Sequence, residues 1–187
     1  MATRALQQPI YAGNRYGGSR RFAGGIEQED TILEAASQSW GAGALIYQTS
    51  GKFAICTATS KVFGQAQRAA SGTTSNKIEN LAIIRPGDRF YMNVYHATAA
   101  SAVWALTMIG LQKRIIVISG KFHVDIETGS AGGTISDGTN VYPFVQVVGF
   151  HPDDAATDVY GRVLVEFGQI SIATDGDPQG YWLQGAA

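Results

Sequence analysis

The chain has a single cysteine, Cys56, among its 187 residues. One cysteine can neither close an internal disulfide nor supply the paired thiolates of a CxxC metal site. A lone cysteine beside an apolar run is most often a small buried hydrophobe. The sequence therefore predicts neither a disulfide nor a cysteine-based metal site.

Charged side chains are also scarce. They make up 16% of the residues, whereas about 25% is usual for soluble domains. The formal net charge is −1, so there is no strong overall field to hold nucleic acid or an anionic membrane. Charge is depleted at the centres of protein interfaces, and this scarcity favours a surface partly covered by other subunits. We therefore expect protein partners, and neither nucleic acid nor a membrane.

No apolar run is long enough to span a bilayer. The longest uncharged stretch, Phe90 to Gln112, contains several polar residues, and its mainly apolar part runs only from Ala99 to Gly110. A spanning helix needs about 20 apolar residues. The first ten residues, MATRALQQPI, lack the apolar segment of a secretory signal. We expect a soluble protein that is made in a cytoplasm.

Glycine, in contrast, is abundant: 23 of the 187 residues, about 12%, against ~7% in average proteins. Apolar residues make up 45% of the chain, enough for one globular domain with its own core. Several segments alternate with period two, as where Phe90, Met92 and Val94 share one face. Such patterns, separated by short turns, predict antiparallel sheets packed on a core. The expected strands lie near 31–35, 44–49, 52–58, 61–66, 79–84, 89–96, 113–119, 121–126, 141–150 and 161–172.

Turn residues separate these strands. Ser50–Gly51 and Ser119–Gly120 are typical of tight hairpins, and the Pro-Gly pair in Arg85–Asp88 predicts a type II turn. Ala97–Gly110 fits either a helix or a strand, and we favour a short helix that crosses the mouth of a barrel. Residues 128–140 form a polar, glycine-rich loop. The predicted class is all-β: a small antiparallel barrel or sandwich with one short helix.

Residues 1–30 differ from the rest of the chain. Their apolar residues show neither a helical nor a strand period, so the segment cannot bury enough surface to order itself alone. We interpret it as an extended N-terminal arm, and 31–187 as a β-barrel domain with a short C-terminal tail. The arm interleaves arginines with aromatic rings, and both are enriched at protein interfaces. The candidate protein-interaction residues are Tyr11, Arg15, Tyr16, Arg20, Arg21 and Phe22.

Two other interpretations of the arm stay open. Its guanidinium groups and rings could stack on nucleic acid, although four arginines are few for that purpose and no basic face follows them. It could also be a disordered tail. An acidic cluster follows directly and is composed of Glu27, Glu29, Asp30 and Glu34.

No residue pattern points to catalysis or to a resident metal. No serine lies in a GxSxG elbow. The histidines form neither an HxH nor an HExxH pair, and we expect surface or half-buried imidazoles at His96, His123 and His151. A solvated loop, rather than a carboxylate pair, is the expectation for Asp153, Asp154 and Asp158. We therefore expect no enzyme activity, no cofactor and no metal.

The order of strands and glycines resembles that of a known family. Gly43–Tyr47 and Ser50–Ile55 are followed by Lys61–Ala66 and a polar segment, Ser71–Asn76. Further along come Ile83–Gly87, Phe90–Val94, Met108–Gly110, a strand pair ending in His123–Asp125, and Gly161–Phe167. This order is similar to that of the decoration, or cement, proteins that coat tailed-phage capsids and have a small barrel called a β-tulip. Gly43–Ala58 is similar in outline to the pattern GxLVxxxxxGxVxxA of that family, with Gly51 one position earlier and Ala58 one position later than in the pattern.

The resemblance covers roughly residues 31–172, and the arm and the loop at 128–140 depart from it. It implies a viral structural protein of the capsid surface that binds the assembled major capsid protein, often as a homotrimer, and has no catalytic residues. Two alternatives stay open: another virion component of the tail or head–tail junction, or a surface module that binds carbohydrate or a host.

Overall fold

The regular secondary structure of the described residues is almost entirely β-strand, as the sequence predicts. The computed structural model describes residues 2–16, 21–23, 34–35, 37–50, 52–57, 62, 64–70, 81–84, 87–127 and 144–167. The strands are β1 (Ile10–Asn14), β2 (Arg21–Ala23), β3 (Leu45–Thr49), β4 (Lys52–Ile55), β5 (Gly64–Gln65), β6 (Leu81–Ile83), β7 (Asp88–Tyr95), β8 (Gln112–Ile118), β9 (Lys121–Asp125), β10 (Phe144–Phe150) and β11 (Arg162–Glu166).

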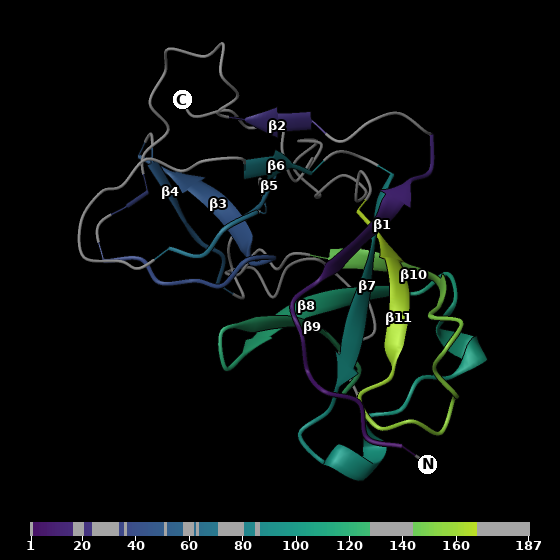
Figure 1. Cartoon of the computed structure of the whole chain (residues 1–187). Coiled ribbons are helices and arrows are strands. Elements are labelled where there is room, and N and C mark those ends of the chain that lie inside the picture. Colours follow the sequence, from purple (N-terminus) through teal and green to yellow (C-terminus); the bar gives the residue numbers. More distant parts are fainter. Residues whose placement is uncertain are drawn as a thin grey trace, which may run out of the picture.

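Five of these strands close into a small barrel. Its order is β7-β11-β10-β8-β9, and β9 returns to β7 through a short parallel pairing of Val94 with Val124 and Tyr95 with Asp125. β1 lies antiparallel to the first half of β7, along residues 88–91, so β1 and β9 share one strand as a partner (Figure 1). The predicted small all-β barrel is confirmed.

A second, five-stranded sheet is inserted in the chain between β1 and β7. Its order is β2-β6-β5-β3-β4, and every pairing in it is antiparallel. Figure 1 shows this sheet beside one end of the barrel. The barrel strands therefore come from β7–β11, whereas the GALIY and SGKFAI segments of the family resemblance lie in the inserted sheet.

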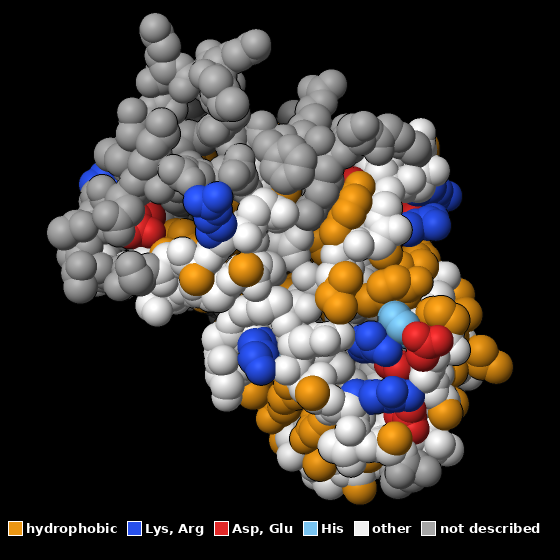
Figure 2. All heavy atoms as spheres, viewed as in Figure 1, with side chains coloured by type: hydrophobic (Ala, Val, Ile, Leu, Met, Phe, Trp, Pro, Cys, Tyr) orange, Lys and Arg blue, Asp and Glu red, His pale blue; other side chains and the backbone are white. Residues whose placement is uncertain are grey.

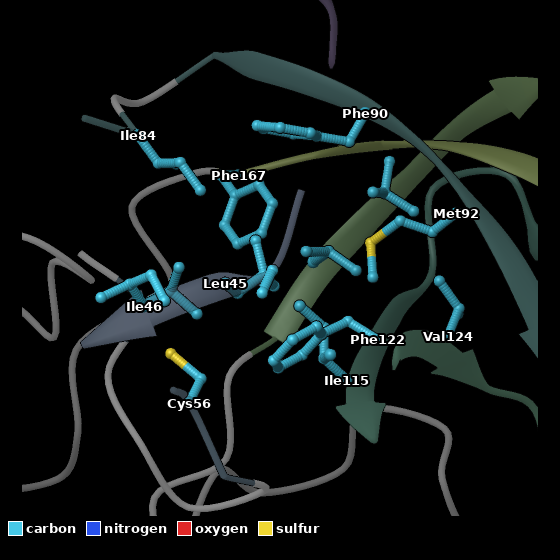
Figure 3. Close-up of a cluster of buried hydrophobic side chains, with 14 of the residues drawn as sticks. Leu45, Ile46, Cys56, Ile84, Phe90, Met92, Ile115, Phe122, Val124 and Phe167 are labelled. Carbon is cyan, nitrogen blue, oxygen red and sulfur yellow. The ribbon is translucent and has the colours of Figure 1, made fainter. Parts of the chain in front are cut away.

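One hydrophobic core joins the barrel to the inserted sheet. Phe90 of β7 meets Phe167 edge to face, with ring centroids 5.3 Å apart, and both rings are fully buried. Leu45, Ile46 and Cys56 belong to the same cluster (Figure 3). Each such apolar side chain contributes about 1.5–3 kcal/mol when fully buried, so neither sheet can lose this contact without a large cost.

The predicted alternation and one predicted turn appear in the structure. Phe90, Met92 and Val94 are buried, as expected for one face of β7. Ser119 and Gly120 both have positive φ, 50° and 71°, in the hairpin between β8 and β9, as a tight two-residue turn requires. The type II turn predicted over Arg85–Asp88 includes two positions, 85 and 86, that lie outside the described residues; Gly87 has the positive φ, 79°, that such a turn reserves for glycine.

The helix expected over Ala97–Gly110 is wrong. The segment contains two single 3-10 turns, η1 (Ala99–Ser101) and η2 (Leu106–Met108), and the backbone of Ala105, just before η2, is extended. The amide of Tyr160 donates to the carbonyl of Ala102 at 2.7 Å, which ties that carbonyl to a distant loop. The Trp104 ring stacks on Phe150 at 3.9 Å between centroids. These tertiary contacts outweigh a weak helical pattern.

The N-terminal arm is also different from expectation over residues 2–16. These residues lie on the barrel instead of extending from it, because the backbone groups of β1 pair with β7. Thr3 forms a parallel bridge with Val159, and the Asn93 side chain bonds to the backbone of Gln7 and Ala5. The segment shows no apolar period because backbone hydrogen bonds and polar side chains, rather than one apolar face, hold it against the barrel. Residues 128–143 and 168–187, which include the expected polar loop and the tail, lie outside the described residues.

Candidate protein-binding surface

The described residues contain no group of three or more His, Cys, Asp and Glu side chains that could hold a metal ion. Cys56 is buried, and burial raises the pKa of its thiol, so the sulfur is not a reactive thiolate. His123 was expected at least partly exposed but is fully buried. The pKa of His123 is lowered to about 4, mainly by burial and to a smaller extent by the positive charge of Lys121. The Ile118 backbone acts in the opposite direction, but its contact with the ring does not have the geometry of a hydrogen bond.

The structure separates the predicted interaction residues. The Tyr11 ring packs edge to face on Phe90 at 5.4 Å, and so belongs to the barrel rather than to a free surface. Arg15 and Tyr16 are exposed and adjacent, with the guanidinium 5.7 Å from the ring centroid. Arg20 lies outside the described residues, and only the backbone of Arg21 and Phe22, within β2, is described.

Arg15 shares the carboxylate of Glu166 with Arg89, and sequence reasoning selected neither of these two residues. Its Nη1 donates to Oε1 of Glu166 at 2.9 Å, and Nε of Arg89 donates to Oε2 of the same carboxylate at 2.8 Å. Glu166 lies opposite Arg89 in the β7–β11 register and opposite Gln146 in the β10–β11 register. These side chains border a hollow of about 240 Å³, which we call the arginine pocket.

An exposed apolar ridge adjoins the arginine pocket. It consists of Leu106, Ile109 and Leu111, which are 72%, 49% and 42% exposed. Ile109 and Gly110 line the pocket itself, and the Gln146 side chain donates to the carbonyl of Gly110 at 3.2 Å. Figure 2 shows several hydrophobic side chains exposed on the surface of the barrel. Exposed apolar side chains next to a polar pocket are typical of a protein interaction site.

The loop between β10 and β11 is an ionic clamp rather than the solvated acidic loop that we expected. Asp154 and Asp158 are buried, 6% and 4% exposed. Arg162 binds both oxygens of Asp154, at 2.8 and 2.7 Å, and lowers the pKa of that carboxyl. The amide of Ala2 and the guanidinium of Arg4 bind Asp158 and lower its pKa. This clamp fastens the N-terminal segment to the barrel.

A larger hollow, of about 550 Å³, lies between the end of β4 and the β8–β9 hairpin. Its lining is mainly apolar, with Ile55, Ile116 and Ile118 beside the ion pair of Arg114 and Asp125. Thr57 and Glu127, at its rim, adjoin residues outside the described part of the chain. The arginine pocket, in contrast, includes Arg15, one of the predicted interaction residues.

Two of the surface residues could have been found from the sequence and the others could not. Arg15 and Tyr16 stand out by composition. Arg89 and Glu166 carry no signal, because only the strand register brings them together. The ridge residues were not selected from the sequence, because the helix expected over Ala97–Gly110 would have buried one apolar side of that segment.

Within the described residues, no helix has the length and apolar character needed to span a membrane. No protein-family model, no curated protein and no solved structure matches this chain. The arrangement of the arginine pocket and the apolar ridge is therefore the basis for a functional conclusion.

Proposed function

We propose that this chain is a structural protein of a tailed-phage virion that binds the outer surface of the assembled capsid and bridges subunits of the major capsid protein. The observation that carries the proposal is the apolar ridge, where Leu106 is 72% exposed on a small barrel. A group of exposed apolar side chains beside a polar pocket is typical of a binding surface. The resemblance to decoration proteins supplies the partner.

The interaction would be one of many identical contacts on a shell. A modest affinity at each site suffices, because several linked sites give an avidity far above that of one. We propose a homotrimer as the linked unit, because the resembled family often assembles in that form. A virion location, after synthesis in the host cytoplasm, follows from this role.

The carbohydrate-binding alternative has less support. Such a module would present tryptophan rings to solvent, but Trp40 is buried and Trp104 stacks on Phe150 within the described part of the chain. Another role in the virion would use the same kind of surface. The capsid proposal is therefore the one that we argue.

Co-sedimentation tests the proposal. The purified protein is mixed with expanded capsids assembled from the major capsid protein of the genome that encodes this chain. We expect saturable binding at a fixed ratio to capsid subunits and a higher disassembly temperature of the particles. A protein that stays in the supernatant at every concentration would contradict a capsid role.

A further inference from the structure

The lining of the arginine pocket carries an excess of positive charge. Its charged residues are Arg15, Arg89 and Glu166, two cations and one anion. Glu166 is 5% exposed, so its carboxylate lies within the barrel wall and is not available to a ligand. The side chain of Arg15 is 54% exposed and that of Arg89 is 34% exposed, so both guanidinium groups reach the open side.

The two guanidinium groups keep most of their hydrogen-bonding capacity. Each has five N–H donors in a planar fork, and in the described structure each donates one hydrogen bond, to Glu166. Their remaining donors suit a second carboxylate, which an arginine binds in a bidentate manner. A volume of about 240 Å³ is several times the ~30 Å³ that one water occupies in the liquid, so an acidic side chain fits.

The apolar ridge indicates which kind of molecule would supply that carboxylate. Ile109 lines the pocket and is itself 49% exposed, so a ligand in the pocket contacts an apolar side chain as well as the arginines. A small free anion would leave Ile109 and Leu106 uncovered. A protein segment with an acidic residue beside an apolar residue would cover both parts of the surface.

We propose that the arginine pocket and the apolar ridge together bind an acidic–apolar segment of the partner protein, with the carboxylate of an Asp or Glu between Arg15 and Arg89 and the neighbouring apolar side chain on Ile109 and Leu106. This proposal rests on the proposed function for the identity of the partner, but not for its chemistry. Glu166 positions the pocket, since it holds both guanidinium groups before the partner arrives and reduces the ordering cost on binding.

The test uses two synthetic peptides and the full-length protein labelled with ¹⁵N. One peptide is acetyl-Gly-Leu-Glu-Leu-Gly-amide, and the other has Gln in place of Glu. Nuclear magnetic resonance follows the side-chain Nε–H signals of Arg15 and Arg89 and the backbone amides of residues 106–111. We expect the Glu peptide to shift both sets of signals and to bind about tenfold more tightly than the Gln peptide, the factor that one charge-assisted contact contributes.

The matched variants are Arg15→Gln and Arg68→Gln. Each removes one exposed positive charge, but Arg68 lies in the loop after β5, away from the arginine pocket. We expect Arg15→Gln to remove most of the preference for Glu over Gln, and Arg68→Gln to leave it unchanged. Equal binding of the two peptides, shifts at other residues, no shifts at millimolar peptide, or equal loss in both variants would each overturn the inference.

The same variants separate this inference from the capsid proposal. If capsids bind the wild type and Arg15→Gln equally, the capsid role stands and the carboxylate pocket is wrong. If the peptides behave as expected but capsids do not bind, the pocket stands and the capsid role is wrong. Self-association of the protein that Arg15→Gln abolishes, without any capsid binding, would place the acidic segment on a second copy and overturn the choice of partner.

Discussion

Arg4 binds Asp158 across 154 residues of sequence. Its Nε and Nη2 atoms donate to Oδ2 of Asp158 at 3.0 and 2.7 Å. The backbone follows, since the amide of Arg4 donates to the carbonyl of Val159 at 2.9 Å and the amide of Val159 donates to Ala2 at 2.8 Å. The first described residues are therefore fastened to the loop between β10 and β11.

Replacing Arg4 with Gln should loosen this segment without unfolding the barrel. The amides of Arg4 and Val159 should exchange with solvent faster, because local opening no longer breaks the ion pair. Hydrogen exchange of the two amides measures this effect. The control is Asp153→Asn, whose side chain is 79% exposed. Unchanged exchange in Arg4→Gln, or equal acceleration in the control, would contradict the clamp.

The clamp should also fail in acid. The pKa values of Asp154 and Asp158 are lowered in the folded protein, chiefly by the hydrogen bond from Arg162 to Asp154 and by that from Ala2 to Asp158. Their stabilisation is present above the ordinary carboxyl pKa and is lost as the pH falls through the lower folded values. Protection of the Arg4 amide, which is its exchange rate relative to the intrinsic rate at the same pH, should therefore persist at pH 4 and be lost only in stronger acid. A loss of protection between pH 6 and 4 would point to another group.

Truncating Tyr11 to Ala should destabilise the isolated protein by about 2–3 kcal/mol, because the ring packs on buried Phe90. Tyr11→Phe should cost less than about 1 kcal/mol, since the 3.4 Å contact of the hydroxyl group with Asp88 is long. Urea unfolding measures both values. An arm that orders only on a capsid predicts instead that neither substitution changes the stability of the free protein.

The strands of the fold were predictable because their alternation reports burial directly. The residues predicted to face the core in β7 and β11 are buried, and the residue types of Ser119 and Gly120 predict the turn that is found there. β1 was not predictable, because an edge strand held by backbone pairs and a bulge between Tyr11 and Gly13 needs no apolar alternation. The prediction for residues 97–110 was wrong for a different reason. The apolar residues of this segment fit both a helical and a strand period, and its conformation depends on long-range contacts.

His123 should make the protein less stable as the pH falls from about 6.5 to 4. Its pKa is about 4 when folded and ~6.5 in an unfolded chain, so the unfolded state binds a proton first and stability falls with decreasing pH. The full loss is about 3 kcal/mol below pH 4. His123→Leu should remove this part of the pH dependence in urea unfolding. A variant with the same pH dependence as the wild type would exclude His123 as its cause.

Gly64→Ala should destabilise the inserted sheet. A Cβ atom at Gly64 would lie 2.6 Å from the carbonyl oxygen of Ala82, a backbone atom that cannot move without breaking the pairing of β5 with β6. We expect a loss of about 1–3 kcal/mol. Gly41→Ala is the matched control, since the nearest atom is 4.0 Å away, and its effect should stay within about 0.5 kcal/mol. Equal effects of the two substitutions would contradict the close approach of β5 to β6.

The binding surface was only partly predictable, for a physical reason. Arg15 and Tyr16 carry their chemistry in their own side chains, so composition finds them. Glu166 acquires its role from Arg15 and Arg89, which lie 151 and 77 residues away in sequence. Such a cluster forms only when the strands pair in the folded protein, so no local sequence pattern predicts it.

The most direct test of the central claim is co-sedimentation of a ridge variant with expanded capsids. Leu106→Ser with Ile109→Ser removes the exposed apolar side chains and should change the free energy of unfolding by no more than about 0.5 kcal/mol per site. Ala100→Ser, at an exposed position in η1, is the control. The account predicts that the wild type and the control sediment with capsids, while the ridge variant binds at least about tenfold more weakly. Equal sedimentation of all three proteins, or of none, would contradict it.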